Sequence, residues 1–144
     1  IDDPQGIEGA AQRVPGLGLL DIETVMSPQK RLTLTQGFYP ATGDVVEGYE
    51  IHIGQSDGPD RTRGWLTFGG QSEGAASPDG RVRGCYLHGL FAADGFRRAF
   101  LAGLGATVSG TDYAAGVEAT LDALADHVTA HLDVAKIAAL AAEV

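Results

Sequence analysis

A histidine at the end of a predicted strand and a single cysteine are the first residues of this chain to consider for chemistry. Residues 81–88 favour an extended chain, and alternation along it places Tyr86 and His88 on one face, and Cys85 and Leu87 on the other. Cys85 and His88 would then lie about 10 Å apart along the strand and point in opposite directions, which rules out a cysteine–histidine pair. Active sites of open α/β sheets lie at such strand ends. We expect His88 to be a catalytic base without a nucleophile in this chain; the alternative is a histidine that caps the sheet.

Glu50 and His52 form a second candidate pair. They lie two residues apart in a predicted strand and therefore share a face, opposite Tyr49 and its apolar neighbours. A carboxylate beside an imidazole can hold the ring in one orientation. Glycines at both ends of the segment 48–54 suggest that another part of the molecule packs closely there. The alternative is a solvated polar face on an edge strand.

His127 and His131 are four residues apart on a predicted helix, the spacing at which two histidines can share a metal ion. No third ligand stands at a motif spacing, so we expect no metal site and interpret the pair as part of a solvated helix face. The glycine-rich stretches 69–70 and 103–105 lack the patterns that bind phosphate groups, so no nucleotide site is expected.

The composition excludes several classes of function. A length of 144 residues suits one domain with a buried core, and a net charge of -9 with only 10 Lys and Arg argues against nucleic-acid binding. No apolar run approaches the roughly 20 residues that span a bilayer, so no membrane contact is expected. One cysteine and no visible leader favour the cytoplasm. Because the chain starts at Ile1 and its only methionine is Met26, we expect an upstream part to be missing.

The hydrophobic pattern predicts strands first and helices last. Residues 1–15 read as a polar connector, and a turn is predicted at 77–80, where proline and glycine set the backbone. A helix capped by Asp94 should end near Gly105. Residues 16–26 form an apolar segment, either a buried strand or a short loop followed by one, which should stop at 27–29. The remaining predicted elements are strands over 31–38, 45–54, 65–68 and 81–88, and helices over 117–132 and 134–140.

Three stretches resemble, in order and spacing, the glutaminase domain of the cobyric acid synthase family: residues 16–24, residues 48–54 with Gly-Tyr-Glu-Ile-His-Ile-Gly, and residues 80–91, which end in Leu-His-Gly-Leu-Phe. The resemblance covers nearly the whole chain. It implies an α/β fold of the class I glutamine amidotransferase type, which is flavodoxin-like, and a carboxyl-terminal fragment of it. Residues 1–91 would be its strand-rich part and residues 92–144 its carboxyl-terminal helices.

The resemblance also implies roles for individual residues. In such domains a cysteine on a strand-to-helix elbow attacks the glutamine amide and a histidine handles the proton. His88 matches that histidine, and the cysteine motif would precede residue 1. Glu50 and His52 match the place where related domains hold glutamine. Leu90 stands where many class I enzymes carry a glutamate that orients the histidine, and Glu50 is our candidate substitute; Cys85 falls where the family often has threonine.

For the whole enzyme, the resemblance implies that glutamine supplies ammonia to a separate ATP-dependent synthetase domain. That domain would amidate a corrinoid, cobyrinic acid a,c-diamide, in cobalamin biosynthesis. ATP and Mg²⁺ would act there, so no cofactor is expected in this portion, and this chain alone should be inactive. Two alternatives stay open: a related amidotransferase with another acceptor, and a non-catalytic scaffold of the same fold.

Overall fold

The computed structural model describes residues 1–108, 110 and 112–141, which form two compact units, Ile1–Val108 and Ser109–Val144. We describe each unit by itself. The first is built around a mixed sheet with the strand order β2-β1-β3-β4-β9, to which β5 and β6 are added beside β3. The strands of the first unit are β1 (Asp2–Asp3), β2 (Gln12–Arg13), β3 (Glu23–Tyr39), β4 (Asp44–Asp57), β5 (Leu66–Phe68), β6 (Gln71–Glu73), β7 (Ala75–Ala76), β8 (Arg83–Gly84) and β9 (Leu87–His88).

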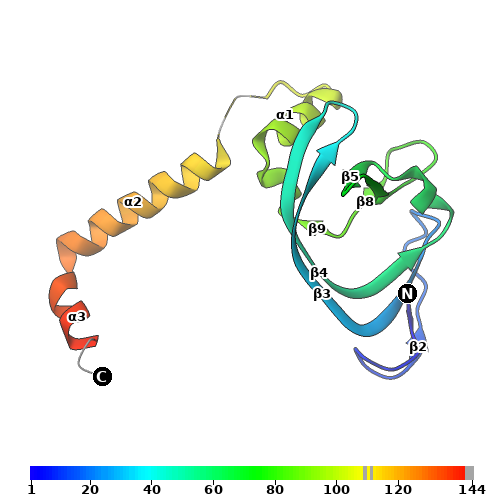
Figure 1. The fold of residues 1–144 in the computed structure, drawn as a ribbon, viewed down its shortest axis with the longest axis horizontal. Helices are drawn as coiled ribbons and strands as arrows, with labels where there is room; N and C mark the ends of the chain where they lie inside the picture. The colour runs from blue at the N-terminus through cyan, green and yellow to red at the C-terminus, as the bar shows by residue number, and fades with distance from the viewer. Residues whose placement is uncertain (109, 111, 142–144) are drawn as a thin grey trace. The chain divides into compact units, whose positions relative to one another are not determined.

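A long, curved antiparallel hairpin of β3 and β4 dominates this unit (Figure 1). Its turn closes through the N–H of Gly43, which donates to the carbonyl of Tyr39 at 2.8 Å, and Gly43 takes a positive φ of 77°. Of the two alternatives for residues 16–26, the structure supports a loop followed by a strand, because β3 begins at Glu23. The predicted stop at 27–29 is wrong: it is a shift of register between Met26 and Arg31 inside β3. A proline is tolerated there because the ladder is already interrupted.

The prediction of one strand over 81–88 is also wrong, because the structure divides the segment. β8 pairs with β7 in a separate two-stranded sheet, whereas β9 joins β4 in the main sheet. Cys85 and Tyr86 lie between these strands and outside either ladder. The predicted turn before them is confirmed: the Gly80 N–H donates to the Ser77 carbonyl at 2.9 Å.

The core of the first unit lies on one side of the hairpin, where β4, β5, β9 and the first α-helix meet. Its buried members are Val46, Leu66, Leu87, Leu90 and Phe96, with Phe96 fully buried. Two 3-10 helices, η1 (Pro59–Arg63) and η2 (Leu90–Ala92), and α1 (Asp94–Gly103) connect and cover these strands. Asp94 was expected to cap α1, but it is the first helical residue and Ala93 holds the cap position. The predicted stop is confirmed, since Gly105 follows with a positive φ of 82°.

The second unit contains α2 (Tyr113–His131) and α3 (Val134–Ala141). Asp112 caps α2 by accepting the Ala115 N–H at 2.9 Å, so the helix begins four residues before the predicted start at 117. Most large apolar side chains of both helices are exposed, and Val128 of α2 is half-buried. Among the described residues, no helix is long and apolar enough to cross a membrane.

Asp3 anchors the first loop and provides a test of the fold. Its buried carboxylate accepts the N–H groups of Glu8 and Ile7, each at 2.9 Å, and these bonds lower the pKa of Asp3 below its ordinary value of 3.8. The ionised form is therefore favoured by folding. The ionised Asp3 carboxylate stabilises the folded protein above pH 3.8. This stabilisation is lost as the pH falls through the pKa of Asp3 in the folded protein, which is lower than 3.8.

We expect Asp3→Asn to flatten the acid limb of a plot of unfolding midpoint against pH, because asparagine does not titrate. Thermal unfolding followed by circular dichroism between about pH 2 and 6 measures this limb. Asp2→Asn, one residue away, is the matched control. An equally steep acid limb in Asp3→Asn would show that other carboxylates dominate acid unfolding.

Candidate active site

His88 lies on the outer face of the sheet, at the end of the short strand β9. In the antiparallel pairing with β4, His88 stands directly opposite Tyr49, and Leu87 stands opposite Glu50. Directly opposite residues share a face, and the two rings stack with centroids 5.0 Å apart and an interplanar angle of 8°. The imidazole is exposed, whereas the neighbouring Leu87 is buried in the core. Leu87 thus anchors β9 and leaves His88 available on the surface.

Gly48 allows β9 to approach β4 so closely. A Cβ atom at this position would overlap the carbonyl oxygen of His88 and lie 3.2 Å from Cδ1 of Leu87. Immediately after His88, Gly89 takes a positive φ of 81° and turns the chain into η2. The position of His88 therefore depends on two glycines, Gly48 within β4 and Gly89 directly after β9.

Glu50 and His52 lie on the other face of β4, toward the core. Glu50 is buried, and its carboxylate forms an ion pair with Arg31 and lies 3.4 Å from Nε2 of His52. Thr35 Oγ1 also donates to Glu50 at 3.4 Å, and Nδ1 of His52 lies 2.8 Å from the carbonyl of Gly54. At Glu50 the alternative of a solvated edge strand is wrong, because β4 pairs there with both β3 and β9 and the carboxylate is buried. His52 lies beyond the β9 ladder and is half-buried.

Tyr86 joins this polar cluster, in which Glu50 is buried and His52 and Tyr86 are half-buried; the sequence did not predict its place there. Its ring stacks on His52 with centroids 3.8 Å apart, and its hydroxyl is 2.6 Å from Ser56 Oγ, which is in turn 2.6 Å from Thr24 Oγ1. Tyr86 was expected to share a face with His88. That prediction is wrong because residues 85 and 86 lie outside the ladder, where strict alternation no longer applies.

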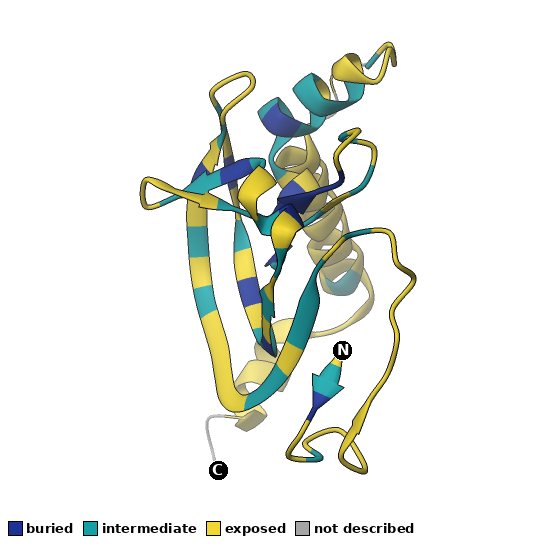
Figure 2. Cartoon of the chain, turned by 90° about the vertical axis from the view of Figure 1, so that its right-hand side faces the viewer, coloured by how far each residue is buried: buried dark blue, intermediate teal, exposed yellow. Residues whose placement is uncertain are grey.

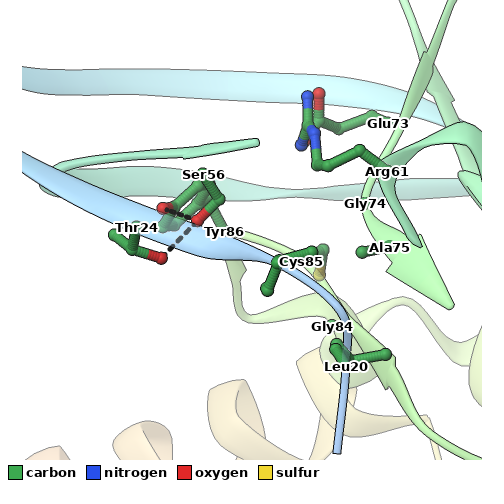
Figure 3. A pocket seen from close by; sticks show the side chains of 11 residues that line it. Leu20, Thr24, Ser56, Arg61, Glu73, Gly74, Ala75, Gly84, Cys85 and Tyr86 are labelled. Carbon is green, nitrogen blue, oxygen red and sulfur yellow. Dashed lines mark hydrogen bonds and ion pairs between the residues drawn. The ribbon is translucent and has the colours of Figure 1, made fainter. Parts of the chain in front are cut away.

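Cys85 lines a cavity of about 230 Å³ together with Tyr86, Ser56 and Thr24 (Figure 3). Burial raises the pKa of the Cys85 thiol above its ordinary value, which disfavours the nucleophilic thiolate. The Arg61–Glu73 ion pair, at 2.9 Å, also lines this cavity. The site geometry therefore gives no support to Cys85 as a nucleophile, in agreement with the expectation from the sequence.

The structure thus brings Glu50 and His52 together but separates both from His88 by the backbone of β4. A side chain of one face does not reach the ring on the other, so this geometry does not support Glu50 as the group that orients His88. Tyr49, which the sequence analysis did not select, is the aromatic partner of His88. Tyr49 lies three residues after Val46 in an alternating strand, so the sequence could have placed the two side chains on opposite faces. It could not have shown that β9 pairs with β4 at Tyr49.

The helix histidines are neighbours. The rings of His127 and His131 have centroids 4.3 Å apart, and Nδ1 of His131 lies 2.8 Å from the carbonyl of His127. In the part of the chain that the structure describes, no three His, Cys, Asp or Glu side chains are grouped as a metal site would need. That no cofactor acts in this portion stays a prediction.

Replacing Glu50 by glutamine tests the separation of the two faces. We expect Glu50→Gln to lose about 1 kcal/mol of stability, since the partner Arg31 is largely exposed and its ion pair is screened by solvent. Because Glu50 and His88 lie on opposite faces, the pH profile of any glutaminase activity should not change. Chemical denaturation measures the loss of stability, and initial rates of glutamine hydrolysis across pH measure the pH profile. A pH profile that shifts in Glu50→Gln would show that Glu50 does orient His88.

The fold and this arrangement define the class of protein: the chain belongs to the CobB/CobQ-like glutamine amidotransferase domain family, whose pattern matches residues 1–96. Among its relatives, the chain is 62% identical over 141 residues to the cobyric acid synthase of Rhodobacter capsulatus, 57% to that of Cereibacter sphaeroides and 54% to that of Bradyrhizobium diazoefficiens. Each alignment covers 98% of this chain and 29% of the relative. The chain therefore spans less than a third of the length of these curated relatives. The family resemblance and the α/β amidotransferase fold expected from the sequence are confirmed.

Proposed function

We propose that this chain is the histidine-bearing part of the glutaminase of a cobyric acid synthase, with glutamine as its substrate. The observation that supports this most directly is the placement of His88: an exposed imidazole at a strand end, held by stacking on Tyr49, in a domain of a glutamine amidotransferase family. The high identity to three cobyric acid synthases supports the choice within the family.

In the proposed reaction, His88 takes the proton of a cysteine thiol from outside this chain, and the resulting thiolate attacks the amide carbon of the glutamine side chain. His88 gives a proton to the departing nitrogen, which leaves as ammonia, and the acyl group stays on sulfur as a thioester. His88 then takes a proton from water, and the attack of that water on the thioester releases glutamate and restores the thiol. Imidazole suits both steps because it gains and loses a proton near neutral pH.

For Glu50 and His52, a role in holding glutamine stays a prediction. A glutamine whose amide lies beside His88 is separated from their side chains by β4, so any contribution of the pair to that glutamine would act through the strand. We propose that their main effect is to fix β4: the buried carboxylate and its partners secure the strand whose opposite face carries Tyr49.

The remainder of the proposal concerns the whole enzyme. The released ammonia would amidate a corrinoid, cobyrinic acid a,c-diamide, in an ATP- and Mg²⁺-dependent synthetase part, within the cytoplasm, with no role for nucleic acid or a membrane. No described residue of this chain is assigned to ATP, Mg²⁺ or the corrinoid, and the chain alone would be inactive.

The test uses a chimera in which this chain replaces the aligned segment of the Rhodobacter capsulatus enzyme. With glutamine labelled with ¹⁵N in its amide, we expect label in the corrinoid product and release of one glutamate for each amide formed. Ammonium salt is the control nitrogen source. A chimera that amidates with ammonium but not with glutamine would contradict the glutaminase proposal and favour a scaffold role.

A further inference from the structure

The cavity beside Cys85 has no role in the proposed reaction. It lies on the side of β4 that carries Glu50 and His52, because Ser56 of the same face is part of its wall. The ring of His88 lies on the other side of the strand, where it stacks on a residue of the alternate face. A ligand in this cavity would therefore leave the imidazole free.

Most of the cavity wall offers no free hydrogen-bonding group. The hydroxyl groups of Ser56 and Tyr86 are 2.6 Å apart, and Ser56 is also 2.6 Å from the hydroxyl group of Thr24, so these groups are partners of one another. The apolar part of the wall consists of Leu20, Ile22, Ala75 and the thiol of Cys85. Pockets for drug-sized ligands measure roughly 300–1,000 Å³. At about 230 Å³, this cavity suits a smaller ligand with an apolar part.

The Arg61–Glu73 ion pair gives the same cavity a charged end. A single contact of 2.9 Å joins Nη1 of Arg61 to Oε1 of Glu73, and among the described residues neither side chain has another hydrogen bond or ion pair. Nε and Nη2 of Arg61 and Oε2 of Glu73 are therefore available to a ligand. The two side chains are only 31% and 26% exposed, so water weakens their interactions less than at an open surface.

We propose that this cavity binds an α-amino acid with an apolar side chain. The ligand's carboxylate would accept hydrogen bonds from Arg61, its ammonium group would donate to Oε2 of Glu73, and its side chain would pack on the apolar wall. Figure 3 shows the ion pair at one end of the view and Leu20 at the other, with Cys85 and Ala75 between them, which is the order that such a ligand needs.

A zwitterion suits this ion pair better than a singly charged ligand. Each charge of the ligand meets the opposite charge of Arg61 or Glu73, so the half-buried site stays neutral. A ligand with one charge would meet its partner but would also place that charge beside a like charge. The head group of an amino acid is therefore the chemistry that this end of the cavity recognises.

Equilibrium dialysis of radiolabelled L-leucine against the full-length chimera tests the proposal. We expect saturable binding that unlabelled L-leucine displaces. An excess of 4-methylpentanoate, which lacks the ammonium group, or of 3-methylbutylamine, which lacks the carboxylate, should not displace it. Absence of saturable binding, or displacement by either analogue or by L-glutamine as effective as that by L-leucine, would overturn the proposal.

Two substitutions that each remove one charge locate the site. Arg61→Gln and Glu73→Gln should each weaken L-leucine binding about tenfold or more, because each removes a hydrogen bond to a charged group. The matched controls are Arg13→Gln and Glu23→Gln, which break an ion pair of 2.8 Å outside the cavity wall. Residues 7–19, which include Arg13, are exposed throughout (Figure 2). An equal loss of binding in a control variant would contradict the assignment.

Photo-leucine, a diazirine analogue of leucine, identifies the contact residues without any substitution. After irradiation of the chimera, we expect mass spectrometry to find label within residues 20–24, 73–75 or 84–86, with less label when L-leucine is in excess. Label confined to other parts of the chimera would sink the proposal. Because neither dialysis nor labelling requires turnover, both remain decisive if the chimera hydrolyses no glutamine and the glutaminase proposal fails.

Discussion

Replacing His88 by alanine should reduce glutamine hydrolysis by the chimera about 10²- to 10⁴-fold, the range that positioned acid–base groups contribute. The exposed face of β4 beside His88 also carries Glu47 and Tyr49, but His88 supplies the imidazole of this surface, the group suited to proton transfer near neutral pH. Because the ring is exposed and its removal leaves the buried Leu87 in place, the fold should persist. Initial rates of glutamate release measure the effect.

Two comparisons separate loss of chemistry from loss of structure. Amidation driven by ammonium salt should be unchanged in His88→Ala, because it does not use the glutaminase site. His127→Ala, on the exposed surface of α2, should hydrolyse glutamine at the wild-type rate. If His88→Ala keeps more than a tenth of the activity, His88 is not the proton-transfer group and its stacking on Tyr49 is structural.

Replacing Gly48 by alanine should displace His88 without changing any side chain of the site. The added methyl group would overlap the carbonyl oxygen of His88, and a backbone atom in a ladder moves only if the strand moves. A misplacement of about 1 Å costs on the order of 10²-fold in rate, and overpacking of this kind destabilises by about 1–3 kcal/mol. Glutamate release and chemical denaturation of the chimera measure the two effects.

Gly16→Ala is the matched control for this substitution. Gly16 has open space around its Cβ position and is not among the glycines with a positive φ, so both activity and stability should stay near wild type. A Gly48→Ala variant with full activity would mean that β9 shifts without moving the imidazole, and the close approach of the two strands would then have no part in placing His88.

The local elements of the fold were predictable because their causes lie within a few residues. The turn at 77–80 follows from proline and glycine, and the end of α1 follows from Gly105. The start of α2 was misplaced because the cap by Asp112 was not recognised. Strand boundaries were less accurate: a register shift near Pro28 keeps β3 continuous, and the change of partner after Gly84 divides the segment 81–88.

The roles of the candidate site residues stay predictions, whereas their arrangement could be read only from the structure. His88, Glu50 and His52 stand in sequence segments that are similar to the family, and the match of residues 1–96 and the identities to cobyric acid synthases confirm that similarity. Strand alternation also placed Glu50 and His52 on one face correctly. It could not show which face of β4 would be buried, because both faces carry large side chains and the choice depends on what packs against them.

The sequence by itself determined the family and the order of strands and helices. Only the tertiary structure decided that His88 and the Glu50–His52 pair lie on opposite sides of one strand. The physical reason is that side-chain direction within a strand is local, with a period of two, whereas the register of β9 against β4 is set by contacts between residues nearly forty positions apart. His88 faces outward because Leu87, one residue earlier, is taken into the core.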